Sequence, residues 1–258
     1  MRVSRKGSRL SFGGAAYRDR RHWRVPGSGP PVQRLPCRGR WLTLLIDPGY
    51  GVATALSIGD GITIDAVLIS HSHPDHCADL NPILRARAWA DDPLPPLPVH
   101  ALPGALDAVL ALDRPEVLAG SYVLDEIEAD DELSIGPFQV FTAPLPHPRP
   151  NLGFRVNAGV RSLVYTGDCG PSDELIHLAD STDLLLGEAS YAGAVPPEIM
   201  GSLSSAVDVG REAAMSGVQR LVLTHLMPNT NETDAIAAAA RHFARSITVA
   251  RPGLVVEV

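Results

Sequence analysis

The six residues HSHPDH at positions 71–76 constrain this chain more than any other part of its sequence. They follow an apolar run, AVLIS at 66–70, which predicts a buried strand. Three imidazoles and one carboxylate within six residues are side chains that bind zinc and similar divalent ions. Three of the nine histidines fall here, which disfavours the plainer interpretation of a polar surface loop that is rich in histidine by chance.

The spacing of these side chains predicts two metal sites. Residues at i and i+2 on an extended segment point the same way, so His71 and His73 can bind one ion. Asp75 and His76 follow the bend that Pro74 introduces and can face a second ion beside the first. We therefore expect further ligands from loops at the ends of later strands.

Three later residues meet that expectation. His147 follows an apolar run that ends at 142, Asp168 lies in the sequence YTGDCG, and His225 ends the apolar run LVLT. Taken alone, a strand-end aspartate is commonly a turn residue, and a strand-end histidine is commonly a surface or core group. Together with the hexapeptide, the three residues favour metal binding.

Short apolar runs separated by Gly, Pro and Asp alternate with helical stretches from residue 42 onward, which predicts sheets covered by helices. We expect strands at 42–46, 64–70, 138–142, 153–157, 162–166, 183–186, 220–224, 247–250 and 254–258, and helices after His76 and at 104–112, 172–179, 204–216 and 232–245. No apolar run approaches the roughly 18 residues of a membrane span.

The order of the motifs HSHPDH, a single histidine, YTGDCG and LVLTHL resembles the metallo-β-lactamase superfamily. The resemblance implies an α/β (α+β) fold, a four-layer αββα sandwich with a dinuclear metal site at one edge, in a hydrolase domain over residues 42–258. The chain is similar to the ribonuclease Z-like and cyclic nucleotide phosphodiesterase branch, because the bridging position holds Asp168 rather than a cysteine. The next residue, Cys169, is not expected to be a ligand.

The resemblance also implies which residues bind two divalent cations. His71, His73 and His147 would hold the first ion, Asp75, His76 and His225 the second, and Asp168 would bridge both. Zn²⁺ is expected, and Mn²⁺ or Fe²⁺ suits the same ligands. Two such ions lower the pKa of a water between them, so that hydroxide attacks phosphorus or a carbonyl carbon, and Asp75 would orient it as the catalytic residue.

The sequence departs from this branch in two places. Leu203 stands where ribonuclease Z-like members have a histidine that can donate a proton, so hydrolysis would need another proton donor. Glu188 and Tyr191 are the candidates for that role or for a substrate contact. His147 and Asp168 are only 21 positions apart, which leaves room for two strands but not for the arm that grips transfer RNA in ribonuclease Z. Processing of transfer RNA is therefore disfavoured.

Charge divides the chain near residue 41. Residues 1–41 hold 11 of the 22 basic residues and one acidic residue, whereas residues 42–258 hold 11 basic and 28 acidic residues. An acidic body disfavours a long nucleic acid as a partner. For the basic leader, 1–41, three interpretations stay open: a disordered arm, a transit-like extension, and a stretch whose reading frame or start site differs from that of the functional protein. Within the leader, 18–25 predicts a poor strand and 26–30 a turn.

Three cysteines without a CxxC pair argue against a disulfide framework, and the first residues lack the apolar run of a secretory signal. We therefore expect a cytoplasmic protein with a small-molecule substrate and no membrane partner, and a homodimer is considered because dimers are common in this superfamily. The expected function is a dinuclear metal-dependent hydrolase that cleaves a small phosphodiester such as a cyclic nucleotide. Two alternatives are a carboxylic ester, thioester or lactone hydrolase of the same fold and a non-catalytic metal-binding protein.

Overall fold

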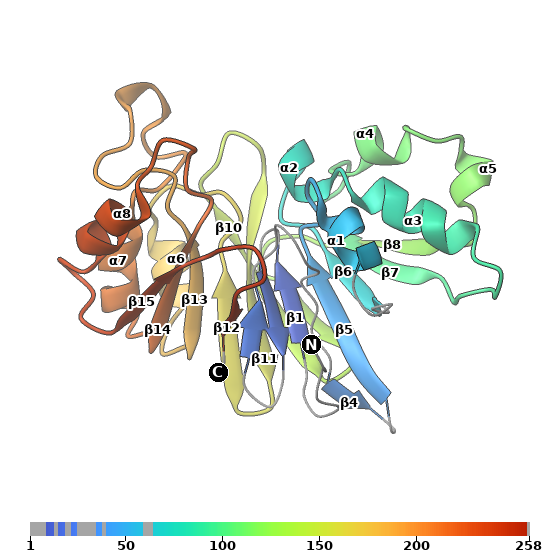
Figure 1. Cartoon of the computed structure of the whole chain (residues 1–258), viewed down its shortest axis with the longest axis horizontal. Helices are drawn as coiled ribbons and strands as arrows, with labels where there is room; N and C mark the ends of the chain where they lie inside the picture. Colours follow the sequence, from blue (N-terminus) through green and yellow to red (C-terminus); the bar gives the residue numbers. More distant parts are fainter. Residues whose placement is uncertain are drawn as a thin grey trace. The chain divides into compact units, whose positions relative to one another are not determined.

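The computed structural model describes the backbone of residues 9–12, 15–18, 22–24, 35–37, 40–58 and 64–256, and the side chains of 42–56 and 64–256. The chain divides into two compact units, of which the first comprises residues 1–127 and 251–258 and the second residues 128–250. Each unit contains one mixed sheet with helices beside it (Figure 1). The two sheets and their helices confirm the predicted mixed α/β class.

The sheet of the first unit has the strand order β16-β2-β1-β5-β6-β7-β8, with β3 paired to β2 and β4 paired to β5. The strands from β5 to β8 run parallel to one another. The elements of this sheet are β1 (Arg9–Phe12), β2 (Ala15–Arg18), β3 (His22–Arg24), β4 (Leu35–Cys37), β5 (Arg40–Ile46), β6 (Ala66–Leu68), β7 (Leu97–Ala101), β8 (Tyr122–Glu126) and β16 (Val255–Val256).

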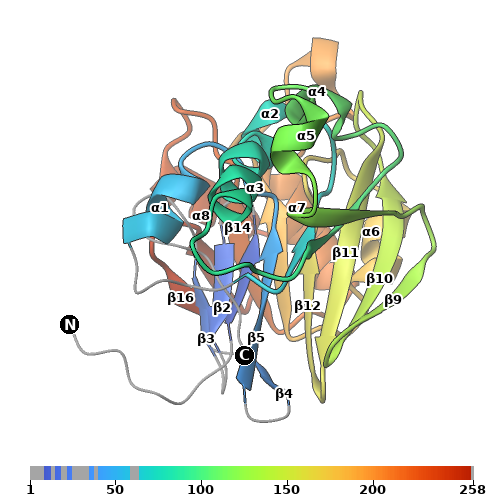
Figure 2. The ribbon, with the colours of Figure 1, turned by 90° about the vertical axis from the view of Figure 1, so that its right-hand side faces the viewer.

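Five short helices accompany this sheet: α1 (Val52–Ile58), α2 (Pro74–Cys77), α3 (Leu80–Ala88), α4 (Asp107–Leu110) and α5 (Pro115–Leu118). Figure 2 shows α3 beside α4 and α5. Leu56 of α1 and Leu84 of α3 join the buried cluster that contains Leu45 of β5 and Val67 of β6. Burial of these side chains holds the helices against the sheet, at about 2 kcal/mol for a fully buried leucine.

The second unit contains a seven-stranded sheet in the order β15-β14-β13-β12-β11-β10-β9. Strands β9 to β12 pair antiparallel, and β12 to β15 pair parallel. The elements are β9 (Glu132–Ile135), β10 (Phe138–Leu145), β11 (Asn151–Ala158), β12 (Arg161–Tyr165), α6 (Asp173–Leu178), β13 (Leu184–Glu188), the 3₁₀ turn η1 (Pro197–Ile199), α7 (Ala206–Met215), β14 (Arg220–Thr224), α8 (Glu232–Ala239) and β15 (Ser246–Val249).

Two of the helices of this unit begin at well-defined caps. Ser205 and Asp208 form a capping box at the start of α7, and Asn231 accepts backbone hydrogen bonds at the start of α8. Val209 of α7 and Ala238 of α8 pack in one buried cluster with Leu221 and Leu223 of β14. The helices are thereby fixed on one face of the parallel half of the sheet.

The parallel strands position the chemistry in both units, because parallel strands end at the same edge of a sheet. In the first unit Asp47 follows β5, and the hexapeptide at 71–76 begins three residues after β6. In the second unit Asp168 follows β12, Glu188 ends β13 and His225 follows β14. Each unit therefore gathers polar side chains at one sheet edge.

Several elements differ from those expected from the sequence. The helix expected to reach residue 245 ends at Ala239, because the chain turns so that Phe243 can pack in the core of the second unit. Strand β7 was not predicted, since it contains Pro98 in a proline-rich run, yet it pairs with β6 and β8 on both sides. Elements β8, β9, α1 and α5 also lack a clear sequence pattern.

Within the basic leader the structure describes β1 to β3, the short β4 and the start of β5. The prediction that 18–25 makes a poor strand is wrong for His22–Arg24, which is β3. Strand β3 pairs antiparallel with β2, and this backbone pairing does not require an apolar pattern at an edge. The turn expected at 26–30 lies outside the described residues, as do 257–258 of the last expected strand.

Candidate metal centre

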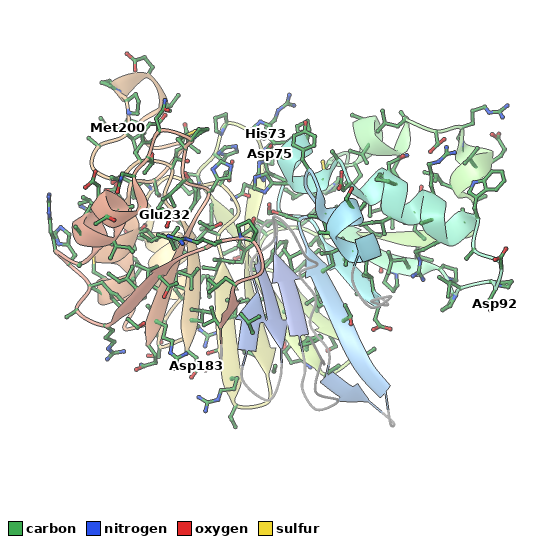
Figure 3. The ribbon with its side chains drawn as sticks, in the orientation of Figure 1. His73, Asp75, Asp92, Asp183, Met200 and Glu232 are labelled. Atoms are coloured by element: carbon green, nitrogen blue, oxygen red, sulfur yellow. The ribbon has the colours of Figure 1, made fainter. Side chains whose placement is uncertain are left out.

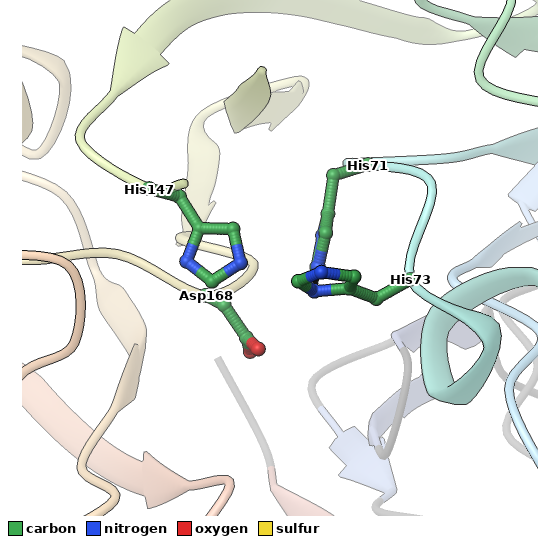
Figure 4. A group of neighbouring side chains, drawn as sticks. All are labelled: His71, His73, His147 and Asp168. Carbon is green, nitrogen blue, oxygen red and sulfur yellow. Dashed lines mark hydrogen bonds between the residues drawn. The ribbon is translucent and has the colours of Figure 1, made fainter. Parts of the chain in front are cut away.

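His71 and His73 lie close together after β6, as the i, i+2 spacing predicts. Nε2 of His71 and Nδ1 of His73 are 3.0 Å apart (Figure 4). Two imidazole nitrogens at this separation either share a proton or face one cation, because ligand nitrogens about 2.1 Å from a zinc ion lie near this distance from each other. His71 is fully buried, so its ring orientation is fixed by its surroundings.

His76 lies in α2, whose first turn begins with Pro74. Proline is well suited to the first helical position, where its missing N–H is not needed. Nδ1 of His76 is 2.8 Å from Oδ2 of Asp47, and Nε2 is 3.7 Å from Oδ2 of Asp75. The Asp75 side chain is 47% exposed, whereas His76 is buried. Figure 3 labels Asp75 next to His73 at the start of this helix.

Asp47 is a functional candidate that the sequence analysis missed. Its carboxylate is buried and accepts hydrogen bonds from the backbone N–H and the hydroxyl of Ser70 and from Nδ1 of His76. Asp47, His71 and His76 each offer a ligand atom within 4.8 Å of the others. An acidic residue directly after the strand predicted at 42–46 is the signal that could have identified it.

The backbone at Asp47 is held in an unusual conformation. Its φ is 49°, in the left-handed region, which costs a non-glycine residue roughly 1 kcal/mol. Two residues later, a Cβ on Gly49 would lie 1.5 Å from the carbonyl oxygen of Asp75. Only glycine permits this approach of the turn after β5 to α2, and the approach holds Asp47 beside His76.

In the second unit, His147 lies in the loop after β10. Its Nδ1 is 3.0 Å from the backbone carbonyl oxygen of Ser202, so Nδ1 carries the proton and donates it. A ligand atom of His147 and one of Asp168 lie within 4.8 Å of each other, and Figure 4 draws both side chains. This arrangement leaves Nε2 of His147 as the ligand atom that a metal would bind.

Asp168 and His225 meet at the ends of β12 and β14. Nε2 of His225 is 3.4 Å from Oδ1 of Asp168, and Nδ1 of His225 is 3.2 Å from the hydroxyl of Ser190. The φ of His225 is 58°, a second left-handed non-glycine residue at a strand end. Such strain persists where surrounding contacts fix the geometry, and it is concentrated at functional sites.

The four histidines with these contacts share one pattern. Ser70 donates its hydroxyl proton to Asp47, so its oxygen accepts from Nδ1 of His71 at 3.0 Å. Ser190 donates to Glu188, so its oxygen accepts from Nδ1 of His225. His76 and His147 donate from Nδ1 to a carboxylate and a carbonyl. Metal-binding histidines commonly have one ring nitrogen held in this way, which directs the other to the ion.

Glu188 is fully buried at the end of β13. Burial first, and then the charge of Asp168, raise the pKa of Glu188 to about 7. Cys169, its backbone neighbour, is also buried, and burial raises the pKa of the thiol well above its usual value. Among the described residues, the groups that could hold a metal contain no cysteine, and the expectation that Cys169 is not a ligand stays a prediction.

Tyr191, Leu203 and His100 belong to none of the described groups that could hold a metal. Tyr191 lies in the loop after β13, half-buried, and its carbonyl oxygen accepts from the N–H of Ala206 at the start of α7. Leu203 lies in the same loop and is half-buried. His100 of β7 is 3.6 Å from Asp125, and burial lowers the pKa of its imidazole.

Comparison with known proteins identifies the family. Residues 42–226 match the family model of the beta-lactamase superfamily domain, which covers well over half of the chain. The chain belongs to the beta-lactamase superfamily. This membership confirms the resemblance stated from the motifs.

Three relatives illustrate the range of the superfamily. An uncharacterized protein of Mycobacterium tuberculosis, Rv1339, is 32% identical over 211 residues, covering 78% of this chain and 76% of the relative. Ribonuclease Z of Mycolicibacterium gilvum is 29% identical over 244 residues, covering 80% and 83%. The probable metallo-hydrolase YhfI of Bacillus subtilis is 27% identical over 220 residues, covering 83% and 88%.

The crystal structure of YhfI, a metallo-beta-lactamase fold protein, superimposes with a TM-score of 0.78 at 22% identity, covering 98% of this chain and 100% of YhfI. At this identity the likeness shows the fold, and it confirms the predicted fold of the superfamily. In the part of the chain that the structure describes, no helix has the length and apolar character needed to cross a membrane.

Proposed function

We propose that this member of the beta-lactamase superfamily is a dinuclear metal-dependent hydrolase that cleaves a small phosphodiester. The observation that carries the proposal is the shared state of four histidines: in each, Nδ1 is held by an oxygen of the protein, which directs Nε2 to a cation. A polar loop that is rich in histidine by chance has no reason to repeat this arrangement after three different strands, β6, β10 and β14.

The proposed ligand sets follow the order of the motifs. As the resemblance implies, we propose that one cation takes His71, His73 and His147, that the other takes Asp75, His76 and His225, and that Asp168 serves both. Imidazole and carboxylate donors fit Zn²⁺, Mn²⁺ and Fe²⁺, and we propose Zn²⁺ first. When bound, two divalent cations make hydroxide available near neutral pH and polarise the substrate's oxygens.

The chain's own groups then orient the reactants. The Asp75 carboxylate is half-exposed beside His76, so it can accept a hydrogen bond from the attacking water. Asp47 holds the ring of His76, and Ser70 holds the ring of His71. Because these rings are already oriented, less entropy is lost when the substrate binds. Glu188 and Tyr191 stay proposals for the missing proton donor at Leu203, although the Glu188 carboxylate is fully buried.

A small phosphodiester is favoured over a long nucleic acid. A relative named ribonuclease Z supports chemistry at a phosphodiester, and the acidic composition of residues 42–258 opposes the binding of a polyanion. A cyclic nucleotide meets both conditions, because it is a phosphodiester with a single negative charge. We propose a cyclic nucleotide as the substrate class, and we propose that the protein is cytoplasmic and acts as a homodimer.

Hydrolysis of a carboxylic ester, thioester or lactone is the second candidate. It is favoured by Leu203, an apolar, half-buried side chain at a position where this branch of the superfamily has a histidine that can protonate an alkoxide leaving group. A thioester needs less assistance from an acid, because a thiolate leaves more readily than an alkoxide.

Turnover of two model substrates separates these candidates. Protein loaded with Zn²⁺ or Mn²⁺ is expected to hydrolyse bis-p-nitrophenyl phosphate and 3′,5′-cyclic AMP faster than p-nitrophenyl acetate. His73→Ala should abolish the activity and one equivalent of bound metal by elemental analysis, whereas His177→Ala, a matched change at an exposed histidine of α6, should alter neither. Turnover of the acetate alone supports the second candidate. Folded, metal-loaded protein that turns over neither is a non-catalytic metal-binding protein.

A further inference from the structure

Glu188 is not one of the proposed ligands of the second unit, but its hydrogen-bond partners lead to Asp168, His225 and His147. None of its surface is exposed, and it belongs to no group of described side chains that could hold a metal. A buried carboxylate is costly unless several donors satisfy it, so its partners indicate what its position serves.

Three donors converge on this carboxylate. Oε2 of Glu188 is 2.7 Å from the backbone N of Cys169, and Oε1 is 2.6 Å from the hydroxyl of Ser190. The backbone N of Ser204 lies 3.3 Å from both oxygens. Charge-assisted hydrogen bonds of this kind are about twice as strong as neutral ones, so the carboxylate joins the turn after β12 to both ends of the loop between β13 and α7.

Two of these contacts lead to a proposed ligand. Cys169 directly follows Asp168, so the bond to its N–H fixes the turn that aims the Asp168 carboxylate. Ser190 passes the connection to His225, since its oxygen is 3.2 Å from Nδ1 of that ring. The direction of this hydrogen bond is set. Ser190 donates its only hydroxyl proton to Glu188, so Nδ1 of His225 must donate to the serine oxygen.

The contact with Ser204 leads to the third proposed ligand, His147. Ser204 is two residues beyond Ser202, whose carbonyl oxygen accepts from Nδ1 of His147 at 3.0 Å. The hydroxyl of Ser204 also donates to the carbonyl oxygen of Cys169 at 2.8 Å, which joins this loop to the turn after β12. The loop thus supports His147 from the segment in which Leu203 replaces the histidine of related proteins.

We propose that Glu188 is the positioning residue of the second unit, which holds Asp168, His225 and His147 in register for the metal ions. The inference rests on the proposed metal-dependent function. The arrangement Glu188–Ser190–His225 repeats Asp47–Ser70–His71 of the first unit, in which a buried carboxylate also acts through a serine on a histidine. A carboxylate is required because all three partners donate, whereas glutamine would present N–H groups to at least one of them.

Glu188→Gln tests this role against a matched control. Glu212 of α7 is also buried and accepts from a backbone N–H, that of Ser172 at 2.7 Å, but it holds the start of α6. In Co²⁺ titrations followed by the visible ligand-field spectrum, Glu188→Gln should weaken binding by about 10- to 100-fold and alter the spectrum, whereas Glu212→Gln should retain both. The thermal stability of both variants is measured alongside.

Two further readouts keep the proposal testable. Ser190→Ala removes only the hydrogen-bonded connection from Glu188 to His225. It should therefore weaken the binding of one of the two cobalt ions, and this can be measured even if Glu188→Gln does not fold. Without metal, the side-chain ¹⁵N resonances of His147 and His225 and the amide exchange of Cys169 and Ser204 should change in Glu188→Gln and stay unchanged in Glu212→Gln.

The outcomes separate this inference from the proposed function. Glu188→Gln protein that is folded and binds two cobalt ions with wild-type affinity and spectrum overturns the role of Glu188. Cobalt binding that depends on Glu188 without any hydrolysis overturns the proposed function but upholds the positioning role. Wild-type protein that binds no cobalt contradicts the metal centre, and the metal-free resonances then decide whether Glu188 organises these loops.

Discussion

Nδ1 of His76 donates a hydrogen bond to Asp47 at 2.8 Å, although 29 residues separate them in sequence. The parallel pairing of β5 with β6 brings these residues together, because the chain leaves both strands at the same edge of the sheet. The contact fixes the tautomer of His76 and raises the basicity of its Nε2, the atom assigned to the cation.

Asp47→Asn is expected to weaken the binding of one metal ion by about 10- to 100-fold, because the amide keeps the shape of the side chain but removes its charge. Isothermal titration with Zn²⁺ measures the effect. Asp79→Asn is the control, since Asp79 also accepts a backbone N–H, from Ala53, and does not contact a proposed ligand. Equal losses of zinc affinity in the two variants would mean that Asp47 contributes only to the stability of the folded chain.

Gly49→Ala should destabilise the first unit by at least about 2 kcal/mol, because the added Cβ would lie 1.5 Å from the backbone oxygen of Asp75 and neither backbone can yield cheaply. Urea denaturation measures the free energy of unfolding. Gly193→Ala is the matched change, since no atom lies within 4 Å of a Cβ there. A wild-type midpoint for Gly49→Ala would contradict the packing of this turn on α2.

The positions of the proposed ligands at strand ends could be predicted from the sequence, because several of them follow a strong strand signal. His71, Asp168 and His225 come after apolar runs that form β6, β12 and β14, and parallel strands end together. Asp47 was missed although it follows the equally clear strand β5, because a lone aspartate before Pro48 reads as a turn.

The groups that hold the proposed ligands in place could not be predicted, because they contact those ligands from positions distant in the sequence. Ser202 supports His147 from 55 residues away through a backbone carbonyl, which any residue carries. Likewise, β3 and β7 form where neighbouring strands complete their backbone hydrogen bonds, despite sequences rich in arginine or proline.

The raised pKa of Glu212 predicts that the free energy of unfolding depends on pH. Burial, offset in part by the hydrogen bond from Ser172, raises the pKa of Glu212 from 4.5 to about 7. Between these values the folded state holds more protons than the unfolded state, so the stability contributed by this group falls as pH rises from 4.5 to 7. Glu212→Gln cannot ionise and should therefore gain stability relative to wild type between pH 5 and pH 8, by up to about 3 kcal/mol.

Urea denaturation at the two pH values measures this change for both proteins. Glu174→Gln, at an exposed position in the first turn of α6, controls for the loss of one negative charge. A constant difference between wild type and Glu212→Gln at pH 5 and pH 8 would contradict the raised pKa.

The buried cysteines should resist alkylation in the folded protein. Cys77 and Cys169 are each about 1% exposed, and burial, followed by the charges of Asp47 and Asp75, raises the pKa of Cys77 to about 12. In a Cys37→Ser background, we expect no reaction with dithiobis-nitrobenzoate at pH 8 and two reactive thiols in guanidinium. An added Val160→Cys, at a position 94% exposed, should react at once and shows that the reagent is active.

Removal of metal should lower the stability of the folded chain. A cation that binds only the folded state stabilises it by about 2.7 kcal/mol at a concentration one hundred times its dissociation constant. A strong chelator is therefore expected to lower the thermal midpoint, and added Zn²⁺ to restore it. Asp168→Asn should abolish most of this response, because the proposed bridging carboxylate belongs to both ligand sets, whereas His177→Ala should keep it in full. A thermal midpoint that changes neither with the chelator nor with added zinc would contradict the metal centre itself, whatever the result of the hydrolysis assays.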